Sequence, residues 1–444
     1  MPKVFRRILV ILRALICLCL LALGVQSSLG VSVLFRNATI HTVSGPTLSN
    51  ADLLIEGAVI KKIGPKLNEK AEQTVDLNGK HIFPGLIAAA TSAGLVEIDM
   101  VRSTRDLSEV GEYTPDVRSW MAVNPDSELL PVARANGITH IVPVPSGGVV
   151  AGQSGLVSLS GWTVDEMTVK APVALHIFWP SMNLDTTPRE QLRDKSKFKS
   201  FEEQAKERAE KIKALDDFFS EAEAYAKSRK ESDPVPAWEA MLPFVNGKIP
   251  LMIHADDQRQ IKAAVEWAAE RKYKMILAGG KDAWMVADLL AKHEVPVVFE
   301  RIYNVSGPLG ATPARDVDAY DVYFRAPEVL HKAGVKVAIG MGLGGQVASE
   351  LRSLPYYTAQ AVAFGLPEEE GLKAITLYPA QMLGVSDRLG SLEEGKEATF
   401  VIADGNILDN RTHVNEVWIR GEKMSLETRH TRLYEKYKNR PKKN

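Results

Sequence analysis

Apolar and polar positions change their spacing several times along the chain, and each change marks a different kind of structure. Residues 33–85 contain short apolar runs that end at turn signals such as Asn78-Gly79. Glycine accepts a positive φ without steric cost, so these dipeptides suit the tight turns of β-hairpins. Strand-like runs of the same kind return at 399–403 and 414–420. We therefore expect the two chain ends to form one small β-sandwich together.

The middle region, residues 85–385, alternates short β-branched runs with longer helical patterns, which is typical of parallel βα units. Most runs are too apolar for a sheet with one face in water, and continuous burial on both faces is what a barrel strand requires. The pattern predicts an α/β fold whose main part is a (β/α)8 TIM-like barrel. Strands are expected at 82–88, 138–144, 173–178, 250–254, 275–278, 295–299 and 335–339.

One stretch of the middle region, residues 189–234, departs from this rhythm. Its apolar residues are spaced by three, four and seven positions, and oppositely charged pairs such as Glu223 and Lys227 lie four residues apart. The spacing predicts a long amphipathic helix inserted before the fifth barrel strand. Its apolar face either packs on the barrel or contacts a partner.

The first 30 residues have the composition of a targeting segment. Three basic residues, Lys3, Arg6 and Arg7, precede an apolar run at 14–25 and a group of small residues at 28–30. This order predicts a secretory signal peptide at 1–30, with a signal anchor as the alternative. The run is shorter than the roughly 20 residues that cross a bilayer. We expect a secreted or periplasmic protein with no stable membrane span after signal cleavage.

Removal of this segment changes the composition in two informative ways. Both cysteines, Cys17 and Cys19, lie within it, so the remaining chain has no thiol. This excludes disulfide frameworks, cysteine nucleophiles and Cys-ligated zinc, and leaves His, Asp, Glu or a modified Lys as metal ligands. The formal net charge falls from −1 to −5, because four basic and no acidic residues are removed. That balance gives no electrostatic case for nucleic-acid binding, and the basic tail at 431–444 is expected to be a solvated end.

Two groups of motifs carry a family resemblance. The first ends in Phe83-Pro84-Gly85-Leu86-Ile87, and the second begins with Ala374-Ile375-Thr376-Leu377-Tyr378-Pro379-Ala380. On these motifs the chain resembles the imidazolonepropionase-related branch of the amidohydrolase superfamily over nearly all residues after the signal. The resemblance implies a barrel at 85–385 beside a β-sandwich built from 31–84 and 386–430. It also implies a hydrolase acting on non-peptide carbon–nitrogen bonds of small, cyclic amide-like compounds.

The first barrel strand departs from the family pattern. In active relatives it ends in Gly-Leu-Ile-Asp-x-His-x-His, and the two histidines bind a divalent metal that activates water. Residues two apart on a strand point the same way, so both histidines face the barrel mouth. In this chain the Asp and the two His positions are occupied by Ala88, Ala90 and Ser92. Ala90 and Ser92 are therefore not expected to be ligands, and the resemblance implies a degenerate metal site.

Of the remaining family ligands the sequence keeps one. His254 stands at the end of the fifth strand, where the family places a histidine ligand. The sixth strand leads into Gly279 and the eighth into Gly340, where the family has a His and an Asp. The fourth strand is not located in the sequence. Because a catalytic zinc needs about three protein ligands, His254 holds at most one divalent metal, zinc, or none.

Four residues form the candidate site: His254, His176, Glu300 and Arg301. His254 is the candidate catalytic residue and metal ligand, since a histidine can transfer protons near pH 7, and its alternative role is a structural bond to a neighbouring loop. His176 lies within an apolar strand, where it faces either the barrel mouth beside His254, as a substrate-binding residue, or the core. Glu300 and Arg301 follow the seventh strand, at the barrel edge where active sites gather. They either bind a polar substrate or form an internal salt bridge.

A glycine-rich stretch at 146–155 is expected to be a tight connection, with an anion-binding loop as the alternative. Its serine, Ser154, does not lie in a nucleophile elbow, because Leu156 stands where that motif requires glycine. Serine hydrolysis is therefore not the expected chemistry.

The sequence leaves two functions open. In the first, the protein hydrolyses a carbon–nitrogen bond with at most a reduced metal site. In the second, the barrel is a catalytically inactive module that binds a small molecule or takes part in an interaction. A small molecule is the expected substrate or ligand, and the sequence leaves a homo-oligomer open.

Overall fold

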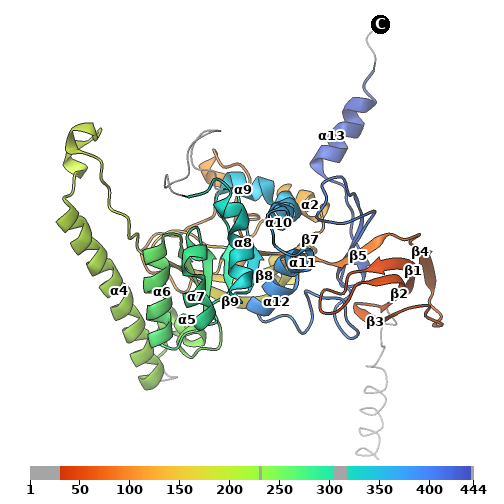
Figure 1. Ribbon diagram of the computed structural model, residues 1–444, viewed down its shortest axis with the longest axis horizontal. Helices are drawn as coiled ribbons and strands as arrows, with labels where there is room; N and C mark the ends of the chain where they lie inside the picture. Colours follow the sequence, from red (N-terminus) through yellow and green to blue (C-terminus); the bar gives the residue numbers. More distant parts are fainter. Residues whose placement is uncertain (1–30, 230–232, 304–317, 442–444) are drawn as a thin grey trace, which may run out of the picture.

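The computed structural model describes residues 31–229, 233–303 and 318–441, so the predicted signal peptide lies outside the described residues. Two separate sheets organise the chain (Figure 1). The smaller sheet lies at one end of the molecule, and the larger one runs through the main body. Among the described helices, none is both long and apolar enough to cross a membrane.

The smaller sheet takes strands from both chain ends. Its strands are β1 (Ser32–Ile40), β2 (Leu48–Glu56), β3 (Val59–Gly64), β4 (Gln73–Asp76), β5 (His81–Pro84), β14 (Phe400–Ala403), β15 (Val414–Ile419) and β16 (Glu422–Lys423). β14 pairs antiparallel with β5, which joins the late strands to the early ones. Phe35, Phe400 and Trp418 pack in its core with ring centroids 5.3 to 5.8 Å apart. The prediction of a separate β module built from both ends is confirmed.

The larger sheet has eight strands that lie side by side in chain order and nearly close into a barrel. They are β6 (Leu86–Thr91), β7 (Ile138–Pro143), β8 (Val150–Ser158), β9 (Thr168–Phe178), β10 (Leu251–Ala255), β11 (Met275–Gly279), β12 (Val297–Phe299) and β13 (Val337–Ile339). Pairing is parallel from β9 through β13 and between β6 and β7. The predicted barrel is confirmed.

One strand corrects the sequence analysis. The glycine-rich stretch is not a connection, because β8 begins within it and pairs antiparallel with both β7 and β9. β8 is the third barrel strand and the one that the sequence pattern missed. The strand predicted at 173–178 lies on β9, which carries His176 and is therefore the fourth barrel strand. Glycine suits this strand because neighbouring groups approach its backbone closely: a Cβ on Gly155 would lie 3.0 Å from the Trp120 ring.

Helices surround the barrel (Figure 1). The α-helices are α2 (Leu129–Arg134), α3 (Val164–Met167), α4 (Phe201–Ser228), α5 (Pro236–Val245), α6 (Gln258–Glu270), α7 (Ala287–Lys292), α8 (Val322–Lys332), α9 (Gly345–Glu350), α10 (Leu354–Ala363), α11 (Glu368–Ala374), α12 (Leu377–Met382) and α13 (Arg429–Lys438). Single 3-10 turns lie at Arg102–Thr104, Ser119–Ala122, Arg189–Gln191, Lys195–Lys197, Ala283–Val286 and Leu351–Ser353. α13 occupies most of the stretch expected to be a solvated tail.

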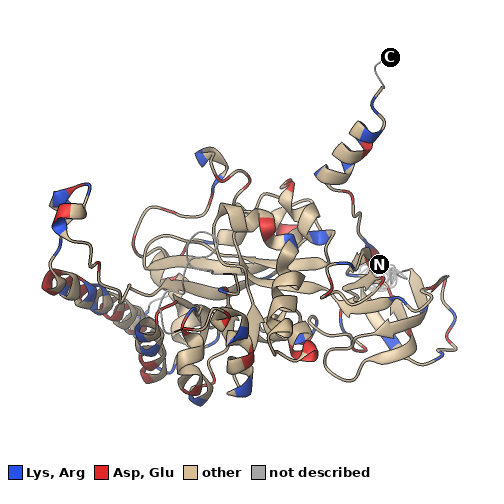
Figure 2. Cartoon of the chain, turned by 45° about the horizontal axis from the view of Figure 1, so that its top comes forward, with Lys and Arg blue, Asp and Glu red and all other residues tan. Residues whose placement is uncertain are grey.

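The inserted helix α4 has 28 residues and begins at a capping box on Ser200. Its second half packs on the barrel, since buried Phe219 meets Trp267 of α6 edge-on with ring centroids 4.9 Å apart. Arg271, just after α6, adds an ion pair to Asp216 at 2.6 Å. Both charge signs are interspersed along its outer side (Figure 2). Of the two roles predicted for this helix, packing on the barrel is the one that these contacts support.

Candidate active site

A cavity of about 310 Å³ opens at the carboxyl ends of the barrel strands, the edge where the active sites of barrel enzymes gather. Three of the four residues proposed from the sequence, His254, Glu300 and Arg301, line this cavity together. Its remaining lining residues are Phe178, Trp179, Ala255, Asp256, Gln260, Ala278, Gly279 and Leu343. Candidates that are far apart in the sequence are thus brought to one place.

Strand alternation explains which side chains face this mouth. An apolar cluster fills the barrel interior and includes Ala174, Met252, Val298 and Ala338. Residues two positions further along a strand point the same way. The residues in those positions are His176, His254, Glu300 and Gly340.

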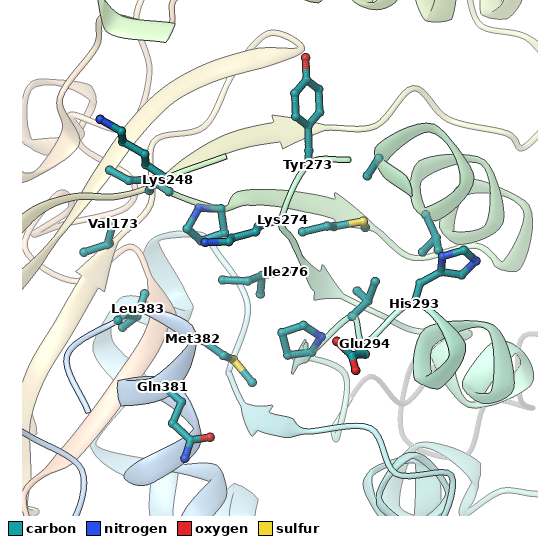
Figure 3. A pocket seen from close by; sticks show the side chains of 18 of the residues that line it. Val173, Lys248, Tyr273, Lys274, Ile276, His293, Glu294, Gln381, Met382 and Leu383 are labelled. Carbon is teal, nitrogen blue, oxygen red and sulfur yellow. The ribbon is translucent and has the colours of Figure 1, made fainter. Parts of the chain in front are cut away.

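A larger cavity, about 570 Å³, lies at the opposite end, where the barrel strands begin (Figure 3). Its lining includes Lys248, just before β10, and Lys274, just before β11, and both side chains are exposed. Volume alone favours this cavity. The carboxyl ends of the strands are nevertheless where barrel chemistry is built, and the buried titratable groups described below lie there.

A chain of hydrogen bonds runs from the barrel interior to the mouth cavity. The Ser154 hydroxyl lies 2.7 Å from His176 Nε2, and His176 Nδ1 lies 3.0 Å from His254 Nε2. Ser154 and His176 are fully buried, so His176 faces inward but does not line the cavity. Phe178 stacks on the His254 ring at 4.3 Å between centroids. His176 therefore orients His254, and Ser154 orients His176.

The two histidines in this chain of hydrogen bonds, His176 and His254, are neutral at pH 7. Burial, followed by the neighbouring His254, lowers the pKa of His176 well below its usual value. Burial also lowers the pKa of His254 to about 3, with Asp256 opposing the shift and Arg301 adding to it. Within the described residues the buried Ser154 hydroxyl has His176 Nε2 as its hydrogen-bond partner, so we assign it as the donor. His176 then donates from Nδ1 to His254 Nε2, which leaves His254 with an Nδ1–H donor.

Glu300 is a buried carboxyl group with an unmet bonding site. The residue is 6% exposed, and its Oε1 atom has no hydrogen-bond partner among the residues that the structure describes. Burial raises the pKa of Glu300 to about 7, Arg301 opposes this shift, and Asp256 adds to it. A carboxyl group with such a pKa exchanges protons at neutral pH.

Arg301 is held by a carboxylate that the sequence analysis did not select. Its Nε donates to Asp256 Oδ1 at 2.9 Å, and its Nη2 donates to Asp256 Oδ2. The main-chain N–H of Lys281 donates to the same carboxylate at 3.1 Å. Arg301 therefore forms an internal salt bridge, but its partner is Asp256 and not Glu300. The one signal in the sequence that points to Asp256 is its position two residues after His254.

A model of the amidohydrolase family matches residues 163–424, more than half of the chain. The chain belongs to this family. The matched range begins just before β9 and includes every residue that lines the mouth cavity.

Individual amidohydrolases agree with this assignment. Amidohydrolase tasK from Hapsidospora irregularis is 23% identical over 437 residues, which cover 88% of this chain and 43% of tasK. An imidazolonepropionase from Pseudomonas fluorescens is 38% identical over 74 residues, which cover 17% of this chain and 18% of that protein. The chain thus spans less than half the length of either relative. A solved amidohydrolase from Thermotoga maritima MSB8 superposes with a TM-score of 0.74 and 26% identity over 88% of this chain and 99% of its own.

The family's usual metal chemistry requires ligands that the described part of this amidohydrolase does not assemble. Across 31–229, 233–303 and 318–441, no group of three or more His, Cys, Asp and Glu side chains is arranged to hold a metal ion. Ala90 is buried in β6, and the Ser92 hydroxyl accepts a hydrogen bond from the Gly344 N–H at 2.9 Å. His254 engages His176 through Nε2. The described residues therefore do not fit a catalytic zinc, which needs about three protein ligands.

Two other histidines near strands lie away from the mouth. His140 of β7 is buried and contacts the Thr139 hydroxyl at 2.9 Å. His81 of β5 contacts His41 at 2.9 Å in the smaller sheet. Neither residue lines the mouth cavity, so the site rests on His254, Glu300, Arg301 and Asp256.

Proposed function

We propose that this amidohydrolase hydrolyses a carbon–nitrogen bond of small, cyclic amide-like compounds in the mouth cavity. The observation that carries the proposal is the meeting of His254, Glu300 and Arg301 in one cavity at the carboxyl ends of the strands. In this assignment His254 is the catalytic residue, and Glu300 and Arg301 bind the substrate. His176 acts through His254 as a positioning residue.

The residues around the cavity suit an amide group. A carbonyl oxygen needs hydrogen-bond donors, and His254 presents the Nδ1–H that its contact with His176 leaves over. An amide N–H needs an acceptor, and the carboxyl group of Glu300, a residue that lines the cavity, is of that kind. The aromatic side chains of Phe178 and Trp179 add an apolar wall for a small ring.

We also propose that the protein belongs to the imidazolonepropionase-related branch, with degenerate metal-ligand motifs. The motifs at 83–87 and 374–380 support this placement, and so does the partial match to the Pseudomonas fluorescens imidazolonepropionase. Its substrates would then be cyclic compounds with a carbon–nitrogen bond next to a carbonyl group. The segment at 1–30 supports a secreted or periplasmic location, which N-terminal sequencing of the exported protein would test.

The alternative function is that of a catalytically inactive binding protein on the same fold. The observation that favours it is the lack of a three-ligand metal group among the described residues. Such a protein would bind the same small molecules, because binding uses the same cavity and the same polar groups, but it would release them intact.

Turnover and binding of one set of compounds decide between these functions. The purified protein and its His254→Ala variant are mixed with a panel of cyclic amides. Ring opening is measured by the appearance of the amine and carboxylate groups of the opened product. Calorimetry measures binding of the same compounds. Hydrolysis by the native protein that His254→Ala abolishes supports the hydrolase, whereas binding without ring opening overturns it in favour of the binding protein.

A further inference from the structure

Two glycines next to the mouth cavity leave space that neighbouring carboxylates occupy. A Cβ on Gly340, which follows β13, would lie 2.9 Å from Glu300 Cγ and 3.0 Å from a Val298 methyl group. A Cβ on Gly279, the last residue of β11, would lie 2.9 Å from Asp256 Oδ1. Separations of this size are below normal van der Waals contact, so a larger residue at either position would displace the carboxylate. Each acid therefore lies against the end of the adjacent strand.

The two carboxylates are in different states. The Asp256 carboxylate accepts hydrogen bonds from the Arg301 side chain and from the Lys281 N–H. Glu300 is more than nine-tenths buried and lines the cavity, and its Oε1 has no partner within the described part of the chain. A buried polar atom without a partner asks for an explanation, and a catalytic role is one of the explanations. The Glu300 carboxyl group is thus the one of this pair that is free to act on a bound molecule.

We propose that Glu300 is the proton-transferring catalytic residue of this site, and that Gly340 is small so that Glu300 can reach the mouth from β12. The inference rests on the proposed function and deepens it, because it gives Glu300 a chemical role in place of a binding role. It requires no ligand other than a cyclic amide and water.

The reaction can be written with these groups alone. The Glu300 carboxylate takes a proton from water while the water oxygen attacks the carbonyl carbon, so a C–O bond forms. The electron pair of the C=O bond moves to oxygen, which accepts a hydrogen bond from His254 Nδ1–H. The oxyanion then reforms the C=O bond, the C–N bond breaks with its electron pair on nitrogen, and Glu300 returns its proton to that nitrogen. One water is consumed, and an amine and a carboxylic acid remain in the opened ring.

The surroundings of Glu300 suit a group that gives and takes a proton. The charged and titratable groups that face it from the described elements are Arg301 beside it and Asp256 and His254 from the end of β10. Arg301 is bound in a two-point contact to Asp256, so it does not form a direct pair with Glu300. His254 is neutral at pH 7. The environment therefore leaves the carboxyl group balanced between its two states, as a general acid and base requires.

The first test compares Glu300→Gln with the native protein on the compounds that the native protein hydrolyses. Glu300→Gln keeps the shape of the side chain but cannot take up the proton of water. We expect kcat to fall by about 10²- to 10⁴-fold, with a much smaller change in KM. The kcat/KM of the native protein should rise as the pH passes through about 7, and this rise should be missing in the variant. Glu294→Gln is the matched control, because Glu294 lines the cavity at the other end of the barrel.

The second test asks whether Gly340 acts through Glu300. Gly340→Ala should lower kcat because its methyl group displaces the Glu300 side chain. The double variant with Glu300→Gln should be no slower than Glu300→Gln alone, since residues that act as a unit give non-additive losses. Circular dichroism and thermal melting establish that the variants are folded, and Glu300→Ala, which also lacks the carboxyl group, replaces Glu300→Gln if that variant does not fold.

The outcomes separate this inference from the proposed function. Native turnover that survives Glu300→Gln, or additive losses in the double variant, overturns the role of Glu300 and leaves the hydrolase intact. Absence of native turnover on the whole panel overturns the hydrolase and the role of Glu300 together. Loss of turnover in both single variants, without further loss in the double variant, supports the inference.

Discussion

The two ends of the barrel hold cavities of different kinds. The cavity where the strands begin is the larger, about 570 Å³ against about 310 Å³ at the mouth. At the larger one Lys274 is exposed, and Lys170 already donates to the carbonyl oxygens of Leu383 and Gly384. At the mouth Glu300 is buried, Arg301 and Asp256 are paired and partly exposed, and Glu300 Oε1 has no partner among the described residues. The meeting of His254 and Glu300 at the carboxyl ends of the strands therefore marks a candidate site better than volume does.

A large loss of turnover that separates the two ends is expected from removal of a histidine. His254→Ala should lower kcat by about 10²- to 10³-fold, because it removes the N–H donor that faces the substrate carbonyl. His293→Ala removes a histidine that lines the larger cavity and should leave kcat unchanged. Steady-state kinetics of both variants on the same substrate test this contrast. Equal losses would show that the two ends are not functionally distinct.

A second contrast is expected in the pH dependence of stability. Burial raises the pKa of Glu300 from 4.5 in the unfolded chain to about 7 in the fold. The folded state therefore binds the Glu300 proton more tightly than the unfolded chain does. The stability that this protonation contributes is fully present below about pH 4.5 and is lost progressively as the pH rises to about 7. The shift corresponds to about 3 kcal/mol.

Urea unfolding of the native protein and of Glu300→Gln measures this contribution. The stability of the native protein relative to the variant should decline across that pH range, because glutamine does not titrate. Glu294→Gln, at the other end of the barrel, should show no such trend. A constant difference between native protein and Glu300→Gln would mean that Glu300 ionises normally in the fold.

A smaller effect is expected from two glycine substitutions. Gly279 and Gly334 both have positive φ, but a Cβ on Gly279 would meet Asp256, whereas a Cβ on Gly334 would have nothing within 4 Å. Gly334→Ala should cost about 1 kcal/mol for its conformation alone. Gly279→Ala should cost about 1 to 3 kcal/mol more, because the added methyl group overlaps the carboxylate. Thermal unfolding of both variants checks the difference, and equal melting temperatures would contradict the close approach of Asp256.

Much of the fold can be predicted from the sequence, because apolar runs report burial directly. The run at 250–254 lies on β10 and carries His254 to the mouth as predicted. β8 could not be predicted, since its glycines look like a loop until Trp120 is seen against Gly155. A strand of this kind is determined by tertiary contacts and not by local preference.

The site was harder to predict than the fold. Asp256 carries no local sign of its partner, because Arg301 is 45 residues away in the sequence. The unmet bonding of Glu300 depends on how β12 and β13 pack, which no sequence pattern reports. Residue types and strand ends therefore predicted three residues that line one cavity, and only the packing shows that Asp256 is engaged by Arg301.

The smallest effect at the mouth is expected from removal of metal ions. Since the described residues assemble no group of three ligands and His254 Nε2 is engaged by His176, dialysis against a chelator should leave turnover unchanged. Metal content of the native protein and of His254→Ala, measured beside turnover, completes the test. Loss of turnover that stoichiometric zinc restores, in the native protein but not in His254→Ala, would assign the chemistry to a metal on His254. Unchanged turnover, combined with the loss expected in Glu300→Gln, would leave proton transfer by Glu300 as the feature that distinguishes the mouth from the opposite end of the barrel.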